Sequence, residues 1–192
     1  MNIKEKLEFY REQIESNFEL VQALQDNCDF EFDDDIDVEN DILICGEKSN
    51  YRIYPFAKDS CGSIYVILDD CYVGFISSEG ACGILASSID EFFNFLFVLK
   101  NLQLYFYSDV FDNLDSFDDK FREINEDIDN KIYEKIIQDN KFLTDIGVLY
   151  EKLKTALIIE PSFILQAEPT LYDQWDDLFY SEQNYIDKLR KK

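Results

Sequence analysis

The chain contains no histidine among its 192 residues. This absence excludes Ser-His-Asp and Cys-His activation of a nucleophile, together with every metal site that needs an imidazole ligand. An enzyme built from this sequence would have to rely on carboxylates, either as an acid and base pair or as ligands for Mg²⁺ or Ca²⁺. Most familiar hydrolase mechanisms are therefore excluded.

Basic residues are scarce as well. Eighteen Lys and Arg stand against 41 Asp and Glu, which gives a formal net charge of −23. Such a charge repels phosphate backbones and anionic lipid surfaces, so we expect no direct nucleic-acid binding and no membrane binding. The same field attracts a basic protein and raises its association rate. The charge favours a cationic protein partner, and a merely well-solvated acidic surface is the alternative.

Motifs for metals and cofactors are missing too. The stretches CGSIYV and CGILA hold one glycine each and match neither a phosphate-binding loop nor a dinucleotide fingerprint, so we expect no cofactor. No secretory signal opens the chain and no apolar run could span a bilayer, which favours a reducing cytoplasm.

The cysteines lack CxxC spacing and are expected to be buried free thiols: Cys28, Cys45, Cys61, Cys71 and Cys82.

The chain has what a folded core requires. It is 46% hydrophobic and includes 17 Phe and 12 Tyr, which argues against disorder despite the charge. Its length suits a single domain over residues 1–192. Within it, we expect residues 101–192 to form a helical portion that packs on an α+β core.

Hydrophobic periodicity predicts the elements of that core. Residues 3–25 are expected to form one helix with a single apolar stripe: Ile3, Leu7, Tyr10, Ile14, Phe18, Val21 and Leu24. Residues 42–86 contain five short strand-like stretches separated by turn compositions, and they predict an antiparallel meander: DILICG, YRIYPF, CGSIYVIL, YVGFIS and CGILA. The next helix is predicted to start near Ser88, with Glu91 completing a capping box.

Helical spacing continues after residue 101. Two packed helices are predicted from two runs of spaced apolar residues: Phe117, Phe121, Ile124, Ile128 and Ile132, then Phe142, Ile146, Leu149, Leu153 and Leu157. Residues 171–192 are predicted to form a last helix. The fold class is thus α+β, with one twisted antiparallel sheet at about residues 42–86, flanking helices and a helical C-terminal extension.

An acidic stretch precedes the meander. No basic residue occurs between Arg11 and Lys48, and residues 26–41 read DNCDFEFDDDIDVEND. The alternation of its aspartates resembles the start of an EF-hand loop, but Val38 stands where that loop needs glycine and Ile44 where it needs glutamate, so we expect no metal site. Apolar residues alternate with the acids, which predicts a loop or edge strand with one carboxylate-rich face. That face is either a surface for a cationic partner or protection of a sheet edge.

The stretch YVILDD, residues 65–70, allows two interpretations. Asp69 and Asp70 could join Glu79 in a carboxylate-only metal-dependent hydrolase, if the two strands pair across the turn. Alternatively, the two aspartates reverse the chain between strands. The missing histidines and the lack of an assured third ligand favour the turn.

Residues 53–97 resemble the SUKH superfamily in the order of their motifs. The resemblance is carried by Pro55-Phe56-Ala57, by Gly62 through Asp69, by Gly74-Phe75, and by Ala86, Ser88, Phe92 and Phe93. It covers about a quarter of the chain and departs from the pattern in the acidic stretch and the long helical tail.

The resemblance implies a non-enzymatic α+β protein. Bacterial members look like immunity proteins of polymorphic toxin systems, and fungal members are regulators of cell-wall synthesis. The expected function is an immunity protein that neutralises a basic toxin domain such as a nuclease, and the alternative is a regulatory or scaffold protein. The expected partner-binding residues are acidic: Asp33, Asp34, Asp35, Asp37, Glu39, Asp41, Asp69 and Asp70.

Overall fold

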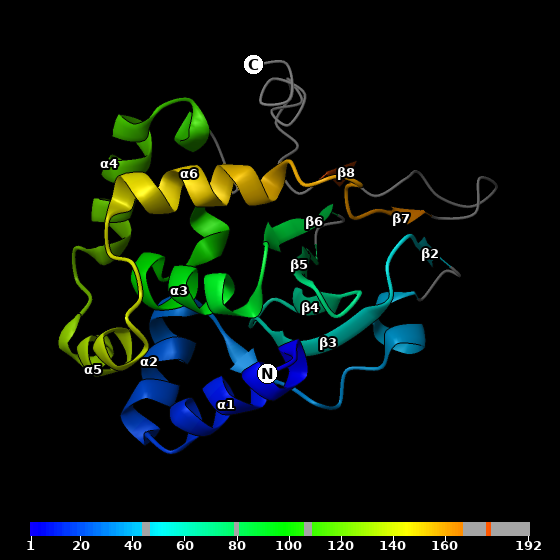
Figure 1. The fold of residues 1–192 in the computed structure, drawn as a ribbon, viewed down its shortest axis with the longest axis horizontal. Coiled ribbons are helices and arrows are strands. Elements are labelled where there is room, and N and C mark those ends of the chain that lie inside the picture. Colours follow the sequence, from blue (N-terminus) through cyan, green and yellow to red (C-terminus); the bar gives the residue numbers. More distant parts are fainter. Residues whose placement is uncertain (44–46, 79–80, 106–108, 167–175, 178–192) are drawn as a thin grey trace.

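An antiparallel sheet lies at the centre of the molecule, flanked by helices, so the α+β prediction is confirmed (Figure 1). The computed structural model describes residues 1–43, 47–78, 81–105, 109–166 and 176–177. The antiparallel strands follow the spatial order β1 (Glu31–Phe32), β3 (Ile53–Lys58), β4 (Ile64–Leu68), β5 (Tyr72–Ile76) and β6 (Ala81–Ala86). Two further short pairings involve β2 (Lys48–Ser49) with β7 (Leu165–Gln166), and β8 (Asp176–Asp177), which runs parallel to β6.

Most of the predicted meander is present, with one exception at its start. The stretches CGSIYVIL and YVGFIS contain β4 and β5, and the stretches YRIYPF and CGILA overlap β3 and β6, of which β3 extends to Lys58 and β6 begins at Ala81. The predicted strand DILICG is wrong at Asp41 and Ile42, which belong to a π-helical turn, η1 (Val38–Ile42), and residues 44–46 lie outside the described residues. The side chain of Asp37 caps this turn by accepting hydrogen bonds from two backbone N–H groups, so a local polar cap outweighs the strand propensity.

The predicted first helix is two helices. α1 (Ile3–Glu15) ends at Ser16, and α2 (Phe18–Cys28) begins at once because Asn17 adopts an extended backbone and its side chain accepts a hydrogen bond from the Leu20 N–H. An N-cap residue starts a new helix in a new direction, so the apolar stripe is interrupted there. Phe18 is consequently 79% exposed, and its assignment to the buried stripe is wrong.

The helical region after the sheet also contains more elements than predicted. α3 (Ile89–Leu99) starts after the N-cap Ser88 as expected. Two short 3₁₀ turns, η2 (Leu102–Tyr105) and η3 (Asp109–Phe111), lead to α4 (Leu114–Asn125), α5 (Lys131–Asn140) and α6 (Ile146–Leu157). The run from Phe117 to Ile132 is therefore divided between α4 and α5. The predicted last helix is contradicted at the two residues of β8, and the remainder of residues 171–192 lies outside the described residues.

The two faces of the sheet carry separate apolar cores. Side chains of β4 alternate between them: Tyr65 and Ile67 join the larger core, to which every helix from α1 to α6 contributes, whereas Ile64, Val66 and Leu68 join a smaller core on the opposite face. We name these the helix-side core and the segment-side core. Because β4 is buried on both faces, the sheet needs a covering layer on each.

Buried and exposed cysteines are both present. Cys28 and Cys82 are buried as predicted, but Cys61 and Cys71 are exposed, and Cys45 lies outside the described residues. Cys61 and Cys71 both lie in turns between strands, where neither core reaches them. Burial raises the pKa of the Cys28 thiol to about 12, which makes it a weak nucleophile.

One lysine is buried in the helix-side region. Lys100 is 1% exposed and follows α3 with a φ of 68°. Its ammonium group donates a hydrogen bond to the Phe97 carbonyl and lies 3.9 Å from the centroid of the Tyr133 ring. Burial lowers the pKa of Lys100 to about 8, because a low-dielectric environment disfavours the charged form.

Candidate partner-binding surface

The acidic stretch passes around the outer edge of the sheet. Phe30 is buried in the helix-side core and Phe32 packs against it, while Ile42 is buried in the segment-side core and Ile36 and Val38 pack against that core. The apolar residues of one short stretch thus serve both faces of the sheet. We call residues 33–41 the acidic segment. Its apolar side chains, Ile36 and Val38, pack against the segment-side core, and most of its carboxylates are exposed. Figure 1 shows this part of the chain between β1 and β2.

Two of its aspartates make ion pairs within the chain. Asp33 Oδ2 lies 2.6 Å from Lys58 Nζ, and Asp34 Oδ1 accepts a hydrogen bond of 2.7 Å from the Arg11 guanidinium. The pKa of Asp33 lies below its usual value because Lys58 and the Asp35 N–H both bond to the charged carboxylate. These two carboxylates are partly neutralised and link the segment to β3 and α1.

Two other aspartates shape the segment itself. Asp37 Oδ1 accepts hydrogen bonds of 2.9 Å from the N–H groups of Glu39 and Asn40, and Asp41 Oδ2 accepts one of 2.7 Å from the Asp37 N–H. Both side chains remain exposed, as do Asp35 and Glu39. The four carboxylates are open to solvent, while their backbone is held by the caps and by the core beneath it.

The predicted turn at YVILDD is confirmed. Asp69 and Asp70 have φ values of 50° and 57°, the left-handed geometry of the central residues of a type I′ turn, and the Cys71 N–H donates to the Leu68 carbonyl across it. Asp69 Oδ1 accepts a hydrogen bond of 2.8 Å from the Arg52 N–H, and Asp70 Oδ2 accepts one of 3.2 Å from the Arg52 guanidinium. One arginine therefore offsets part of the charge of this turn.

The expected binding residues fall into two groups. Asp69 and Asp70 follow Leu68, which pairs with Ile53 at the start of β3, whereas Asp33 contacts Lys58 at the end of β3. Five residues of extended strand separate the two positions, a distance of roughly 17 Å. Among the described residues no three His, Cys, Asp or Glu side chains are grouped to hold a metal ion, and Glu79, the third residue of the hydrolase hypothesis, lies outside them.

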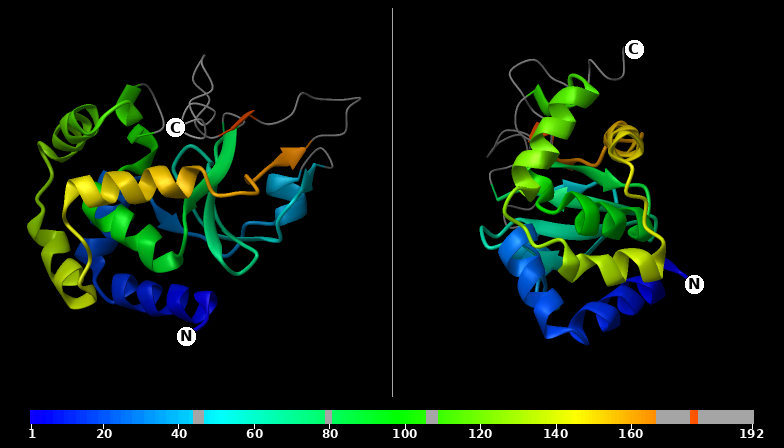
Figure 2. Two further views of the ribbon diagram at one scale, coloured as in Figure 1. Left: turned by 45° about the horizontal axis from the view of Figure 1, so that its top comes forward. Right: turned by 90° about the vertical axis from the view of Figure 1, so that its left-hand side faces the viewer.

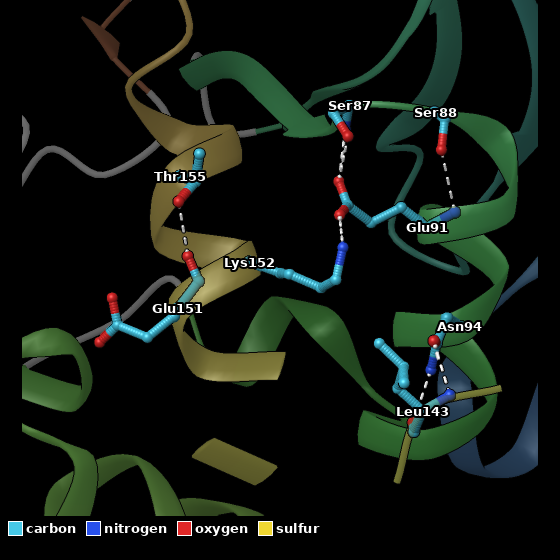
Figure 3. A network of polar contacts seen from close by, with 8 residues as sticks. All are labelled: Ser87, Ser88, Glu91, Asn94, Leu143, Glu151, Lys152 and Thr155. Atoms are coloured by element: carbon cyan, nitrogen blue, oxygen red, sulfur yellow. Dashed lines mark hydrogen bonds and ion pairs between the residues drawn. The ribbon is translucent and has the colours of Figure 1, made fainter. Parts of the chain in front are cut away.

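A polar network that the sequence did not reveal joins α3 to α6. Figure 3 shows the Glu91 carboxylate between Ser87 and Lys152. It accepts hydrogen bonds of 2.8 Å from the Ser87 N–H and 2.6 Å from the Ser87 hydroxyl, and one of 3.0 Å from Lys152 Nζ. The predicted capping box is half formed, because the Glu91 N–H donates to the Ser88 hydroxyl while the Glu91 carboxylate bonds to Ser87. In the sequence, the one sign that Glu91 has a structural role is its position three residues after the N-cap Ser88.

The network borders a cleft of about 560 Å³ lined by residues of α6, including Val148 and Ala156. Ser87 and Lys152 each bond to Glu91, whose side chain is only 10% exposed. The Glu91 carboxylate thus accepts hydrogen bonds from the Ser87 hydroxyl on one side and from Lys152 on the other. The network fixes α6 against the junction of β6 and α3.

Comparison of the chain with protein-family models, with curated proteins and with solved structures finds no match in any of the three. The resemblance to the SUKH superfamily accordingly stays a prediction from the sequence. In the part of the chain that the structure describes, no helix is both long enough and apolar enough to cross a membrane.

Proposed function

We propose that this chain is a non-enzymatic binding protein that neutralises a basic toxin domain, such as a nuclease, through its acidic surface, in the way of an immunity protein. The observation that carries the proposal is the construction of the acidic segment. Ile36 and Val38 pack its inner side against the segment-side core, Ile42 directly after the segment is buried in that core, and exposed carboxylates occupy its outer side. The segment-side core thus holds the backbone of the acidic segment in place beneath its exposed carboxylates.

Fixed charges suit the recognition of a basic protein. Side chains that are already positioned lose little conformational entropy on binding, so more of the interaction energy appears as affinity. Complementary charge also steers the encounter and raises the association rate constant. Nucleases carry basic surfaces for their substrates, and a charge of −23 competes directly for such a surface.

The predicted binding residues contribute unequally to this surface. Asp35, Asp37, Glu39 and Asp41 are exposed, and the one described cation that interacts electrostatically with any of them is Lys58, which lies near Asp35. Asp33 and Asp34 already engage Lys58 and Arg11, and the Asp69 and Asp70 turn shares Arg52. We therefore centre the proposed interface on the four exposed carboxylates of residues 35–41, with the turn at its periphery.

Co-expression with toxin genes from the same locus tests the proposal. The wild-type chain is expected to protect cells and to form a complex whose affinity falls as salt rises. The paired substitution Asp35→Lys with Glu39→Lys should weaken that complex by about tenfold or more, mainly through the association rate constant measured by surface plasmon resonance.

A matched control separates the segment from total charge. Glu126→Lys with Asp127→Lys makes the same charge change at two exposed acids after α4, and it should leave affinity within about twofold. The proposal fails if the wild-type chain protects against no neighbouring toxin. It fails equally if the control pair weakens the complex as much as the segment pair does.

A further inference from the structure

A groove of about 750 Å³ lies between α5 and the junction of α1 and α2. Its apolar lining comes from all three helices and includes Phe9, Phe18, Leu20, Ile132 and Ile136. We call it the elbow groove. The junction lies at the opposite end of the molecule from η1 in both ribbon views (Figure 1 and Figure 2), so the groove is separate from the acidic segment.

Two aromatic rings in the groove are open to solvent. Phe18 is 79% exposed and Phe9 is 43% exposed, while Leu20 beside them is buried. The N-cap at Asn17 turns α2 away from the line of α1 and leaves Phe18 on the outside. Large apolar side chains that line a concave site mark a surface for another molecule, because their contact with water is unfavourable until they are covered.

The walls of the groove are fixed to each other. Asn140 Nδ2 of α5 donates hydrogen bonds of 2.9 Å to Gln13 Oε1 of α1 and to the Ile136 carbonyl. The Tyr133 hydroxyl of α5 donates a hydrogen bond of 2.9 Å to the Ala23 carbonyl of α2. A partner would therefore meet a groove that is already formed, which lowers the entropic cost of binding.

Acidic side chains flank the groove, since Glu19 of α2 and Asp139 of α5 line it. Between residues 8 and 19 the exposed charged side chains are all glutamates: Glu8, Glu12, Glu15 and Glu19. Two nearby cations are already engaged, since Lys6 pairs with Asp90 and Arg11 pairs with both Asp34 and Glu15, so the charge of Glu15 is partly offset. The opposite wall carries Lys135 as well as Asp139, and Lys135 is the one cation that lines the groove in the described part of the chain.

We propose that the elbow groove binds an amphipathic helix of a partner protein, with apolar side chains over Phe9 and Phe18 and with Lys or Arg facing the glutamates of α1 and α2. Helix-in-groove recognition uses this combination of apolar anchors and flanking charge. A second copy of this chain is the poorer occupant, because each copy carries a charge of −23 and the copies repel each other.

A labelled peptide of Leu and Lys, designed as an amphipathic helix of about 18 residues, is the probe. Fluorescence anisotropy at physiological ionic strength should show binding, and Phe9→Ser with Phe18→Ser should weaken it by at least about tenfold. Leu114→Ser removes a 43% exposed apolar side chain at the start of α4 and should change affinity less than about twofold. Amide chemical shifts should change along α1, α2 and α5.

Three controls keep the result specific. A peptide with the same lysines but serine in place of leucine should bind at least about tenfold more weakly, since charge alone does not fill the groove. Asp35→Lys with Glu39→Lys should leave peptide affinity within about twofold, so this test and that of the acidic segment can fail independently. Equal binding by the Phe9 and Phe18 variant overturns the proposal. The proposal is also overturned if sedimentation shows that the wild-type chain forms a dimer and that the Phe18→Ser variant does not, because the groove then binds a second copy of the chain.

Discussion

The two cores of the molecule differ in where their charged residues lie. The helix-side core encloses a cation, Lys100, whose ammonium group bonds to the Phe97 carbonyl, lies over the Tyr133 ring and interacts electrostatically with the Cys28 thiol. The segment-side core is capped by the most acidic part of the chain, yet the apolar residues Ile36 and Ile42 face it and the carboxylates point outward. A stretch rich in acidic residues can therefore cover an apolar core when its acidic residues alternate with apolar ones. The single buried cation, Lys100, instead has a lowered pKa.

The cores also differ in how the chain assembles them. The helix-side core gathers the faces of six helices, many of them adjacent in sequence. The segment-side core joins distant pieces, because Ile42 and Tyr51 meet Phe163 and Leu165 across the face of β4. Fewer residues close the second core, so each of them carries a larger share of its stability.

The largest expected effect tests the anchoring of the acidic segment. Ile42→Ala removes a side chain that is 2% exposed from the segment-side core and should lower the free energy of unfolding by about 2–5 kcal/mol, measured by urea denaturation. Amide hydrogen exchange in residues 35–41 should accelerate as well, since the turn η1 loses its anchor.

Glu39→Ala is the matched control for that prediction. Glu39 lies in the same turn but is exposed, so its removal should change the unfolding free energy by less than about 0.5 kcal/mol. If the two variants destabilise the protein equally, the segment is not held by its apolar side and the contrast between the cores does not hold.

Much of the fold was predictable because local patterns agreed with the tertiary structure. Strands β3 to β6 carry β-branched and aromatic residues between turn sequences, and their hairpins pair in chain order. The break between α1 and α2 was missed because apolar spacing continues through it, while the cap at Asn17 is a single side-chain hydrogen bond. One polar residue thus decided whether Phe18 would be buried.

For the candidate surfaces, the sequence predicted which residue types are present but not how they pack or pair. The sequence revealed the alternation of acids and apolar residues in the acidic segment, but not that Ile36 and Phe30 serve opposite faces of a sheet. The pairing of Lys58 with Asp33, 25 positions earlier, depends on the register of β1 and β3. Long-range register and helix packing are set by the whole core, so no local pattern contains them.

The second prediction addresses the buried charge of the helix-side core. The lowering of the Lys100 pKa from 10.5 to about 8 corresponds to a cost of about 3 kcal/mol for keeping the charge in the folded state. Lys100→Met removes this cost and also the hydrogen bond to the Phe97 carbonyl, worth about 1 kcal/mol. The variant should therefore be more stable by about 2 kcal/mol at pH 7 in urea denaturation.

The stability difference between Lys100→Met and the wild type should depend on pH. Between pH 8 and pH 10.5 the unfolded wild-type chain holds the Lys100 proton more tightly than the folded chain does, so wild-type stability gains from rising pH. The gap between the variant and the wild type should shrink as the pH is raised from 7 to about 10. A constant gap over this range would show that Lys100 does not titrate in the folded protein, and the contrast between the cores would then rest on packing alone.

The smallest expected effect concerns the ion pair that ties the acidic segment to β3. The Asp33 pKa is depressed by Lys58 and by the Asp35 N–H, so the pair stabilises the folded state above the ordinary aspartate pKa of about 4 and is lost as the pH falls through the folded value. Asp33→Asn should lower the denaturation midpoint slightly at pH 7, and the difference from the wild type should shrink as the pH falls below 4, with Glu39→Gln as the exposed control. Because Lys58 is 44% exposed, salt should reduce the difference at pH 7. A difference that persists at pH 2 would mean that Asp33 acts through the shape of its turn rather than through its charge.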